Sequence, residues 1–117
     1  MFNINIYLVY FYINYIVLIK MSLTTDIKNK ISVLDLVSEH ADLKRQGRLY
    51  KALCPFHNEN TPSFIVDPEK NIWRCFGACS VGGDIFSFLM KKENISFIES
   101  LKYFSKKLGI SDISFNS

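Results

Sequence analysis

The sequence predicts an α+β fold in which a small antiparallel sheet is flanked by short helices. Three observations lead to this prediction: cysteine and histidine residues gather in two short groups, turn residues join short extended runs, and helix caps precede apolar stripes. At 117 residues, the chain is long enough for one domain with a modest core. The formal net charge of +3 does not by itself indicate a polyanionic partner.

All three cysteines and one of the two histidines lie in the groups Cys54-Pro-Phe-His57 and Cys75-Phe-Gly-Ala-Cys79. Two closely spaced soft donors, a long excursion and two more donors allow a chain to close a tetrahedron around Zn²⁺. The odd number of cysteines argues against a disulfide framework, whereas a Cys₃His set uses every thiol. We therefore predict a zinc-ribbon-like fold with one zinc ion, bound by Cys54, His57, Cys75 and Cys79.

Four protein ligands fill the zinc shell and leave no position for a reactive water, so the predicted zinc is structural. Lys51 and Arg74, each close in sequence to a ligand, are expected to offset the negative charge of three thiolates. His40 has no donor nearby in sequence and is expected on the surface. The acidic residues are dispersed and no glycine-rich phosphate loop is present, so we predict no catalytic site on this chain.

Turn residues divide the middle of the chain into short extended runs. Gln46-Gly47 separates residues 42–45 from 48–53, and residues 68–71 separate 63–67 from 72–75. The second hairpin carries the chain from one ligand pair to the other. Gly82-Gly83 is expected to form a flexible turn.

Helix signals lie on both sides of these runs. Apolar residues at 27, 31 and 34 repeat at helical spacing, and Ser32 resembles the start of a capping box that begins a second short helix. Asp84 is expected to cap a helix with an apolar stripe at 85, 88 and 89. Ser96 and Glu99 form a capping box before an apolar stripe at 97, 101, 104 and 108.

Residues 1–20 have a different composition, with Lys20 as their one charged side chain. A membrane helix needs about 20 apolar residues, which this segment nearly provides although Asn3, Asn5 and Asn14 weaken it. A secretory signal fits worse, because no basic start or small-residue cleavage site is present. We favour a third interpretation, in which translation starts at Met21 and residues 1–20 are A/T-rich upstream sequence. The predicted organisation is thus an apolar segment 1–20, a zinc-binding domain 21–110 and a tail 111–117, in the cytoplasm and away from membranes.

The stretch from Lys44 to Phe64, with its Cys-Pro-Phe-His and Thr-Pro-Ser-Phe elements, resembles the zinc-binding domain of bacterial and phage DnaG-type DNA primases. Trp73-Arg-Cys-Phe-Gly and Gly82-Gly-Asp-Ile-Phe86 extend the resemblance, which covers roughly residues 24–109. It implies a zinc ion at one edge of an antiparallel sheet whose face contacts the single-stranded template. The three-residue spacer before Cys79, in place of the usual two, resembles variants on phages, plasmids and other mobile elements.

Sites for single-stranded nucleic acid combine cations along the backbone path with aromatic faces for stacking. The candidates for phosphate contact are Lys44, Arg48, Lys51, Lys70 and Arg74, and the candidates for stacking are Tyr50, Phe64 and Trp73. The alternative for each residue is that the ring belongs to the core and the charge is merely solvated. Arg48 and Arg74 are favoured because both neighbour aromatic residues on opposing predicted strands.

The predicted function is recognition of single-stranded template DNA for primer synthesis in DNA replication, with no polymerase domain on this chain. The chain would act as a part or partner of a DNA primase. An alternative is a zinc-stapled interaction module that docks on a separate polymerase subunit or a replicative helicase through its C-terminal helix. A third hypothesis is a membrane-tethered regulator.

Overall fold

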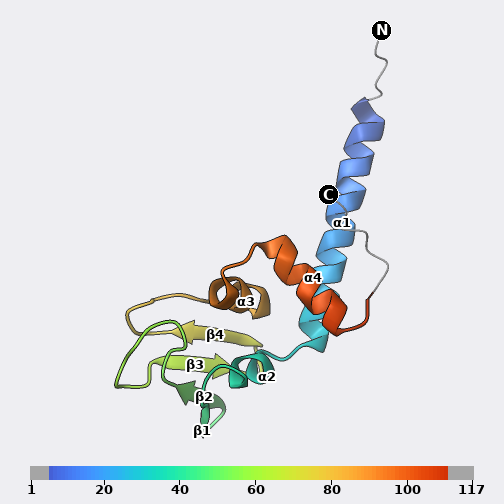
Figure 1. Ribbon diagram of the computed structural model, residues 1–117. Coiled ribbons are helices and arrows are strands. Elements are labelled where there is room, and N and C mark those ends of the chain that lie inside the picture. The colour runs from blue at the N-terminus through green and yellow to red at the C-terminus, as the bar shows by residue number, and fades with distance from the viewer. Residues whose placement is uncertain (1–5, 111–117) are drawn as a thin grey trace.

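The computed structural model describes residues 6–110 and confirms the predicted α+β class (Figure 1). Its sheet has the strand order β1-β2-β3-β4-β5, and all neighbouring strands are antiparallel. The predicted tail 111–117 lies outside the described residues. The elements are, in chain order, α1 (Ile6–Lys30), α2 (Val33–Ser38), β1 (Lys44–Gln46), β2 (Leu49–Ala52), β3 (Phe64–Asp67), β4 (Ile72–Cys75), β5 (Gly82–Gly83), α3 (Ile85–Glu93) and α4 (Phe97–Lys107).

Both predicted hairpins are present, with a shift of one residue in the first turn. Gln46 pairs with Leu49, so Gly47 and Arg48 form the turn, and Gly47 has the positive φ of 64° that such a turn requires. The expectation that residues 82–83 form a flexible turn is wrong. They are strand β5, and a Cβ at Gly82 would lie 2.7 Å from the carbonyl oxygen of Trp73, so only glycine lets β5 approach β4.

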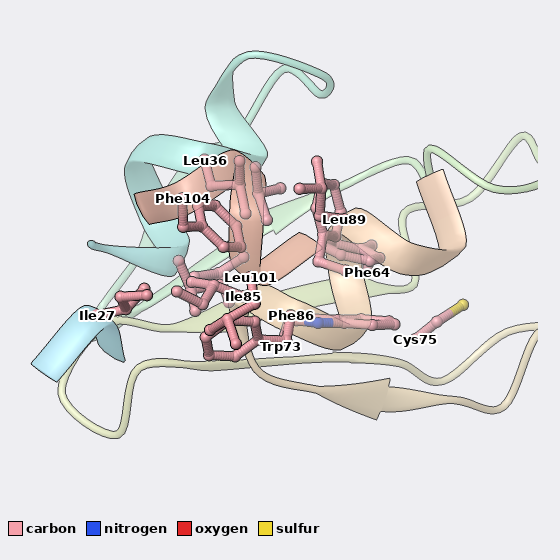
Figure 2. Packing of buried hydrophobic residues seen from close by; sticks show 14 of the residues in the cluster. Ile27, Leu36, Phe64, Trp73, Cys75, Ile85, Phe86, Leu89, Leu101 and Phe104 are labelled. Atoms are coloured by element: carbon pink, nitrogen blue, oxygen red, sulfur yellow. The ribbon is translucent and has the colours of Figure 1, made fainter. Parts of the chain in front are cut away.

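One face of the sheet forms the hydrophobic core with the helices (Figure 2). Along β4 the burial alternates, with Trp73 and Cys75 buried between exposed neighbours. The rings of Phe64 and Trp73 stack with centroids 5.3 Å apart, and Phe88 from α3 meets Trp73 edge-on at 5.8 Å. The indole Nε1–H donates to the carbonyl oxygen of Asp84 at 2.9 Å, so the buried indole has its hydrogen-bond partner.

The other face of the sheet is open to solvent. Ile65 pairs with Arg74 across β3 and β4, and Lys51 pairs with Ile65 across β2 and β3, so these three side chains form one row. Arg74 is exposed, and Lys51 and Ile65 are half-buried. We call this the open face and its opposite the covered face.

The predicted break between two helices at Ser32 is confirmed. Ser32 is the N-cap of α2, and the side chain of Asn71, in the β3–β4 turn, bridges the break. Its Oδ1 accepts from the Val33 N–H at 2.7 Å, and its Nδ2 donates to the carbonyl oxygens of Lys28 and Ile31 at 3.1 Å each. One side chain thus satisfies backbone groups at the end of α1 and the start of α2.

The predicted caps of the last two helices are also confirmed. Asp84 and Ser96 are the N-caps of α3 and α4, and both form capping boxes. Asp84 also pairs with Lys28 Nζ at 2.8 Å, which joins α3 to α1. Burial acts to raise the pKa of Asp84, but the hydrogen bond from Lys28, that from the Ser87 N–H and the charge of Lys28 act together to lower that pKa.

Helix α1 runs without interruption across Met21 and extends away from the rest of the molecule (Figure 1). Leu23 and Ile27 pack into the core, whereas most of the large apolar side chains before them are exposed. Among the described helices, α1 is long and apolar enough to cross a membrane, and only 6% of its most apolar stretch is buried. Length and composition alone are weak grounds for a span, because signal sequences satisfy them as well. The start at Met21 stays a prediction.

Candidate metal centre

The structure brings the four predicted ligands together at one end of the sheet. Cys54 and His57 lie in the loop after β2, Cys75 is the last residue of β4, and Cys79 lies in the loop before β5. Their ligand atoms all fall within 4.8 Å of one another. The loop after β2 therefore supplies one pair of donors, and the end of β4 with the loop that follows it supplies the other.

The spacing of two of the sulfurs fits a tetrahedral zinc shell. Cys54 Sγ and Cys79 Sγ are 3.6 Å apart, close to the roughly 3.8 Å expected between sulfurs bonded to zinc at about 2.3 Å. His57 directs Nδ1 toward Cys79 Sγ at 2.7 Å, closer than the roughly 3.5 Å expected between a nitrogen and a sulfur on one zinc, so these two atoms must move apart when the ion binds. Three thiolates and one imidazole complete the coordination of one structural Zn²⁺ and leave no open position.

A tight turn places Cys79 beside the other ligands despite the three-residue spacer. The Ser80 N–H and hydroxyl both donate to the Gly77 carbonyl oxygen, at 3.2 and 3.1 Å, and Ser80 has a positive φ of 49°. The Cys75 N–H donates to the Val81 carbonyl oxygen at 2.7 Å, which returns the chain to β5. The additional residue is accommodated within this turn.

The protonation of the thiols shows why the cluster needs a cation. Burial is the main cause that raises the pKa of Cys54 to about 12. Burial also acts against ionisation of Cys75, but hydrogen bonds, the one from the Gly77 N–H foremost, lower its pKa. Zinc binds thiolates, so zinc binding must release the proton of a thiol whose pKa is raised, as it is at Cys54.

Charge compensation by direct contact is not seen among the described residues. Arg74 lies on the open face, opposite to the next residue Cys75, so a role for its charge at the zinc cluster stays a prediction. Neither Arg74 nor Lys51 contacts a ligand sulfur within the described part of the chain. A backbone group does so instead, because the Phe56 N–H points to Cys54 Sγ at 3.4 Å.

Residues 19–116 match the family model described as CHC2 zinc finger. The chain belongs to the CHC2 zinc finger family. Similar relatives are the DNA primase of Geobacillus stearothermophilus, 50% identical over 84 residues, and that of Staphylococcus epidermidis, 46% identical over 92 residues. These matches cover 72% and 79% of this chain but only 14% and 15% of the relatives. The chain therefore spans only about one seventh (14% and 15%) of the length of these two primases.

A solved structure shows the same fold. The crystal structure of the Aquifex aeolicus primase (zinc binding and RNA polymerase domains) superposes with a TM-score of 0.68 at 38% identity, covering 77% of this chain and 23% of that chain. The family model, the relatives and the Cys₃His cluster together identify this CHC2 zinc finger as a zinc-binding domain of the DNA primase type.

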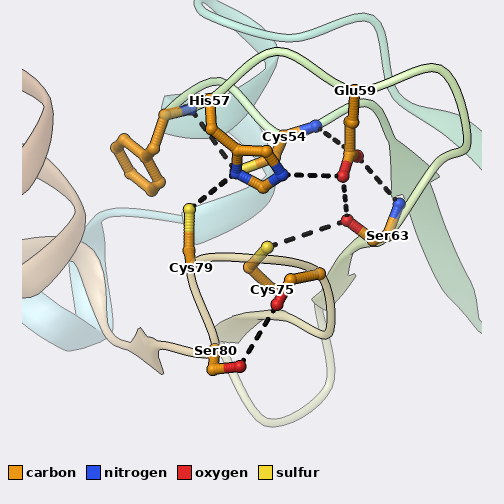
Figure 3. A network of polar contacts seen from close by, with 9 residues as sticks. Cys54, His57, Glu59, Ser63, Cys75, Cys79 and Ser80 are labelled. Atoms are coloured by element: carbon orange, nitrogen blue, oxygen red, sulfur yellow. Dashed lines mark hydrogen bonds and ion pairs between the residues drawn. The ribbon is translucent and has the colours of Figure 1, made fainter.

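One residue of the metal centre was missed in the sequence. Glu59 lies in the same loop as His57 and accepts a hydrogen bond from His57 Nε2 at 2.9 Å (Figure 3). The hydrogen bond from the Ser63 hydroxyl, and those from the Cys54 and Ser63 N–H groups, hold the pKa of Glu59 below its usual range. Its position two residues after a predicted ligand was the available signal.

Two of the three predicted stacking residues lie in the core, and stacking by Tyr50 stays a prediction. Phe64 and Trp73 are 0% and 2% exposed, so their assignment to base stacking is wrong and they belong to the core. Tyr50 pairs with Val66 on the same covered face and is half-buried. The CHC2 zinc finger uses these rings to hold its sheet to its helices.

The predicted cations are divided among the open face and two turns. Lys44 pairs in register with Lys51, in the same row as Arg74. Arg48 lies in the β1–β2 turn and pairs with Glu69 at 3.1 Å, with both side chains largely exposed, and Lys70 is exposed in the β3–β4 turn.

An exposed aromatic residue on this side was not predicted. Phe76 follows the ligand Cys75, is 64% exposed and lies under the Arg74 guanidinium, which is 5.3 Å from the ring centroid. The CHC2 zinc finger therefore presents a cation and an aromatic ring next to its metal centre.

His40, expected on the surface, is half-buried. Its ring lies 5.6 Å from that of Phe88, so it packs against α3. It is not part of the ligand cluster.

Proposed function

We propose that this CHC2 zinc finger recognises single-stranded template DNA for primer synthesis, and that it does so with the open face of its sheet. The observation that carries the proposal is the pair of Arg74 and Phe76 on this face, beside the zinc ligands. An exposed ring and a guanidinium in contact are the two groups that single-stranded nucleic acid requires, one for a base and one for a phosphate.

A shallow groove of about 240 Å³ next to Phe76 offers room for a base. Its floor is apolar, and its lining residues are Leu49, Ile65, Asp67, Ile72, Trp73, Arg74 and Phe76. Stacking of one base on an aromatic side chain contributes about 1–3 kcal/mol. This groove therefore suits a flat nucleic-acid base, while the charged backbone of the strand stays in solvent.

The cations of the open face give a path for the phosphates. Lys44 and Lys51 are direct cross-strand partners, and like charges in this position destabilise a sheet unless an anion lies between them. Lys44 has a carboxylate partner in Asp42 at 3.3 Å, but both side chains are largely exposed, so this pair is weak. A phosphate near the two lysines would relieve their repulsion.

Primer synthesis would require a polymerase domain on another chain or segment. The relatives named DNA primase are several times longer than the matched region, and the Aquifex aeolicus structure contains an RNA polymerase domain. We propose that this chain acts in the cytoplasm as a part or partner of such an enzyme, with a polymerase subunit or a replicative helicase as its protein partner.

A docking role is favoured by one observation on the C-terminal helix. Phe97 and Tyr103 of α4 are 37% and 46% exposed, which leaves apolar surface on this helix. In this second candidate function, α4 binds a polymerase subunit, and the DNA-binding experiment below separates the two roles.

The test is fluorescence anisotropy of labelled single-stranded DNA titrated with the zinc-loaded chain. We expect Phe76→Ala to weaken binding about 5- to 150-fold, which corresponds to the loss of one stacked base. Arg74→Ala is expected to weaken binding and to lower the salt dependence by about one phosphate contact. Arg48→Ala should have a smaller effect, since Arg48 lies in a turn and already pairs with Glu69.

The matched control is Lys92→Ala, which removes one exposed charge from α3 on the other side of the sheet. Binding that does not respond to salt would contradict the proposal. So would equal affinities for Phe76→Ala, Arg74→Ala and the Lys92→Ala control.

A further inference from the structure

We propose that Glu59 is the positioning residue of the metal centre: it orients His57 so that Nδ1 faces the zinc, and it joins the two ligand loops. This inference concerns the retention of zinc and does not depend on the proposed DNA binding. It rests on a set of hydrogen bonds that occupies both carboxylate oxygens (Figure 3).

The carboxylate of Glu59 accepts hydrogen bonds at both oxygens from groups of the first ligand loop. Oε1 accepts from His57 Nε2 at 2.9 Å and from the Ser63 hydroxyl. Oε2 accepts from the backbone N–H groups of Cys54 at 2.9 Å and Ser63 at 3.1 Å. Four donors meet one side chain, and only an ionised carboxylate accepts at both oxygens without offering a hydrogen.

The contact with Nε2 determines which ring nitrogen of His57 is free for the metal. A neutral imidazole carries one hydrogen, and donation from Nε2 to Glu59 leaves the lone pair on Nδ1. Nδ1 is the nitrogen that faces the ligand sulfurs, 2.7 Å from Cys79 Sγ. A carboxylate on the far nitrogen of a ligand histidine fixes the ring orientation and makes the other nitrogen a better donor.

Ser63 extends the same network to the second pair of ligands. Its hydroxyl lies 3.7 Å from Cys75 Sγ, and its carbonyl oxygen accepts from the Phe76 N–H at 2.9 Å. Glu59 therefore connects the loop that carries Cys54 and His57 to the strand end that carries Cys75.

A separate observation at Gly77 supports the importance of this network. A Cβ at Gly77 would lie 2.5 Å from Ser63 Oγ and 2.9 Å from Glu59 Oε1, both closer than side chains approach one another. The second ligand loop therefore passes so close to the Glu59–Ser63 pair that a side chain at position 77 would displace it.

The experiment compares zinc affinity in Glu59→Gln and in the matched control Glu69→Gln, each as the full chain. Glutamine has nearly the shape of glutamate. It replaces one carboxylate oxygen by an NH₂ group, which cannot accept the two hydrogen bonds that this oxygen accepts in Glu59. Competition with a chromogenic chelator should show a 10- to 100-fold weaker zinc affinity for Glu59→Gln. Glu69→Gln, in the exposed β3–β4 turn, should equal the unchanged protein.

A second measurement reads the histidine itself. In the zinc-loaded chain, ¹⁵N NMR should show a slowly exchanging hydrogen on His57 Nε2, and this hydrogen should exchange faster in Glu59→Gln. If Glu59→Gln does not fold, Ser63→Ala keeps the carboxylate and removes one donor, and it should lower zinc affinity by a smaller factor. Zinc bound through Nε2 of His57 would overturn the proposal, and so would a zinc affinity of Glu59→Gln within twofold of the Glu69→Gln control.

Discussion

The two faces of the sheet use similar residues for opposite purposes. On the covered face, Trp73 is buried against Phe64 and the helices. On the open face, one residue further along β4, Arg74 is exposed and contacts the exposed ring of Phe76. Since successive side chains of a strand point to opposite faces, the difference between core and surface here is a single step along the chain. Whether an aromatic residue in this sheet belongs to the core or to the surface therefore depends on which face its side chain points to, and being aromatic does not determine this.

The largest expected effect is the loss of both faces together when zinc is removed. The covered face ends at the ligand Cys75 and the open face ends at Phe76, so both depend on the same metal. Structural zinc contributes about 10–16 kcal/mol of apparent binding free energy that is coupled to folding, and small domains have about 5–15 kcal/mol in total. We expect a strong chelator, or Cys75→Ser, to abolish the sheet signal and the cooperative melting transition in circular dichroism.

Addition of excess zinc after chelation should restore both the sheet signal and the melting transition. If the chelated chain melts at the same temperature as the zinc-loaded chain, the fold does not depend on the metal.

A smaller effect should separate the two faces. Trp73→Ala opens a cavity in the core and is expected to lower the free energy of unfolding by about 3–5 kcal/mol. Arg74→Ala, its neighbour on the open face, should change that free energy by about 0.5 kcal/mol or less. Denaturant unfolding of the zinc-loaded variants measures both, and similar losses for the two would show that the faces are not energetically distinct.

The smallest effect concerns the turn that joins β3 to β4. Asn71→Gly retains the positive φ of 57° without strain but removes the side chain that bridges α1 and α2. We expect a loss of about 1–3 kcal/mol, because buried backbone groups lose their partners. Hydrogen exchange should become faster at the Val33 amide, whose acceptor is Asn71 Oδ1, whereas unchanged exchange there would contradict the assigned role.

The sequence predicted those features that depend on neighbouring residues. The ligand pairs, the hairpins and the caps at Ser32, Asp84 and Ser96 follow from short spacings, and the structure contains them. The sheet face of an aromatic residue does not follow, because alternation defines two faces without indicating which is covered. For this reason Phe64 and Trp73 were assigned to stacking and Phe76 was missed.

The other structural features that were not predicted depend on contacts between segments that are distant in sequence. Asn71 binds backbone groups 38 to 43 residues away, and a single asparagine in a turn gives no sign of such partners. The short strand β5 consists of two glycines, which have low strand propensity, and its pairing results from close approach to β4. Glu59 carried a local signal, but its four donors converge only after the loop has folded.

The order of the strands bears on how quickly the fold can form. Every strand pairs with its neighbour in the chain, and the ligands Cys54 and Cys79 are only 25 residues apart. The entropy of closing a loop grows only with the logarithm of its length, and local topologies fold faster than those with distant pairings. The metal-binding hairpins can therefore assemble before α1 and α4 meet, so the supply of zinc should limit the rate of refolding more than the search for the correct topology does.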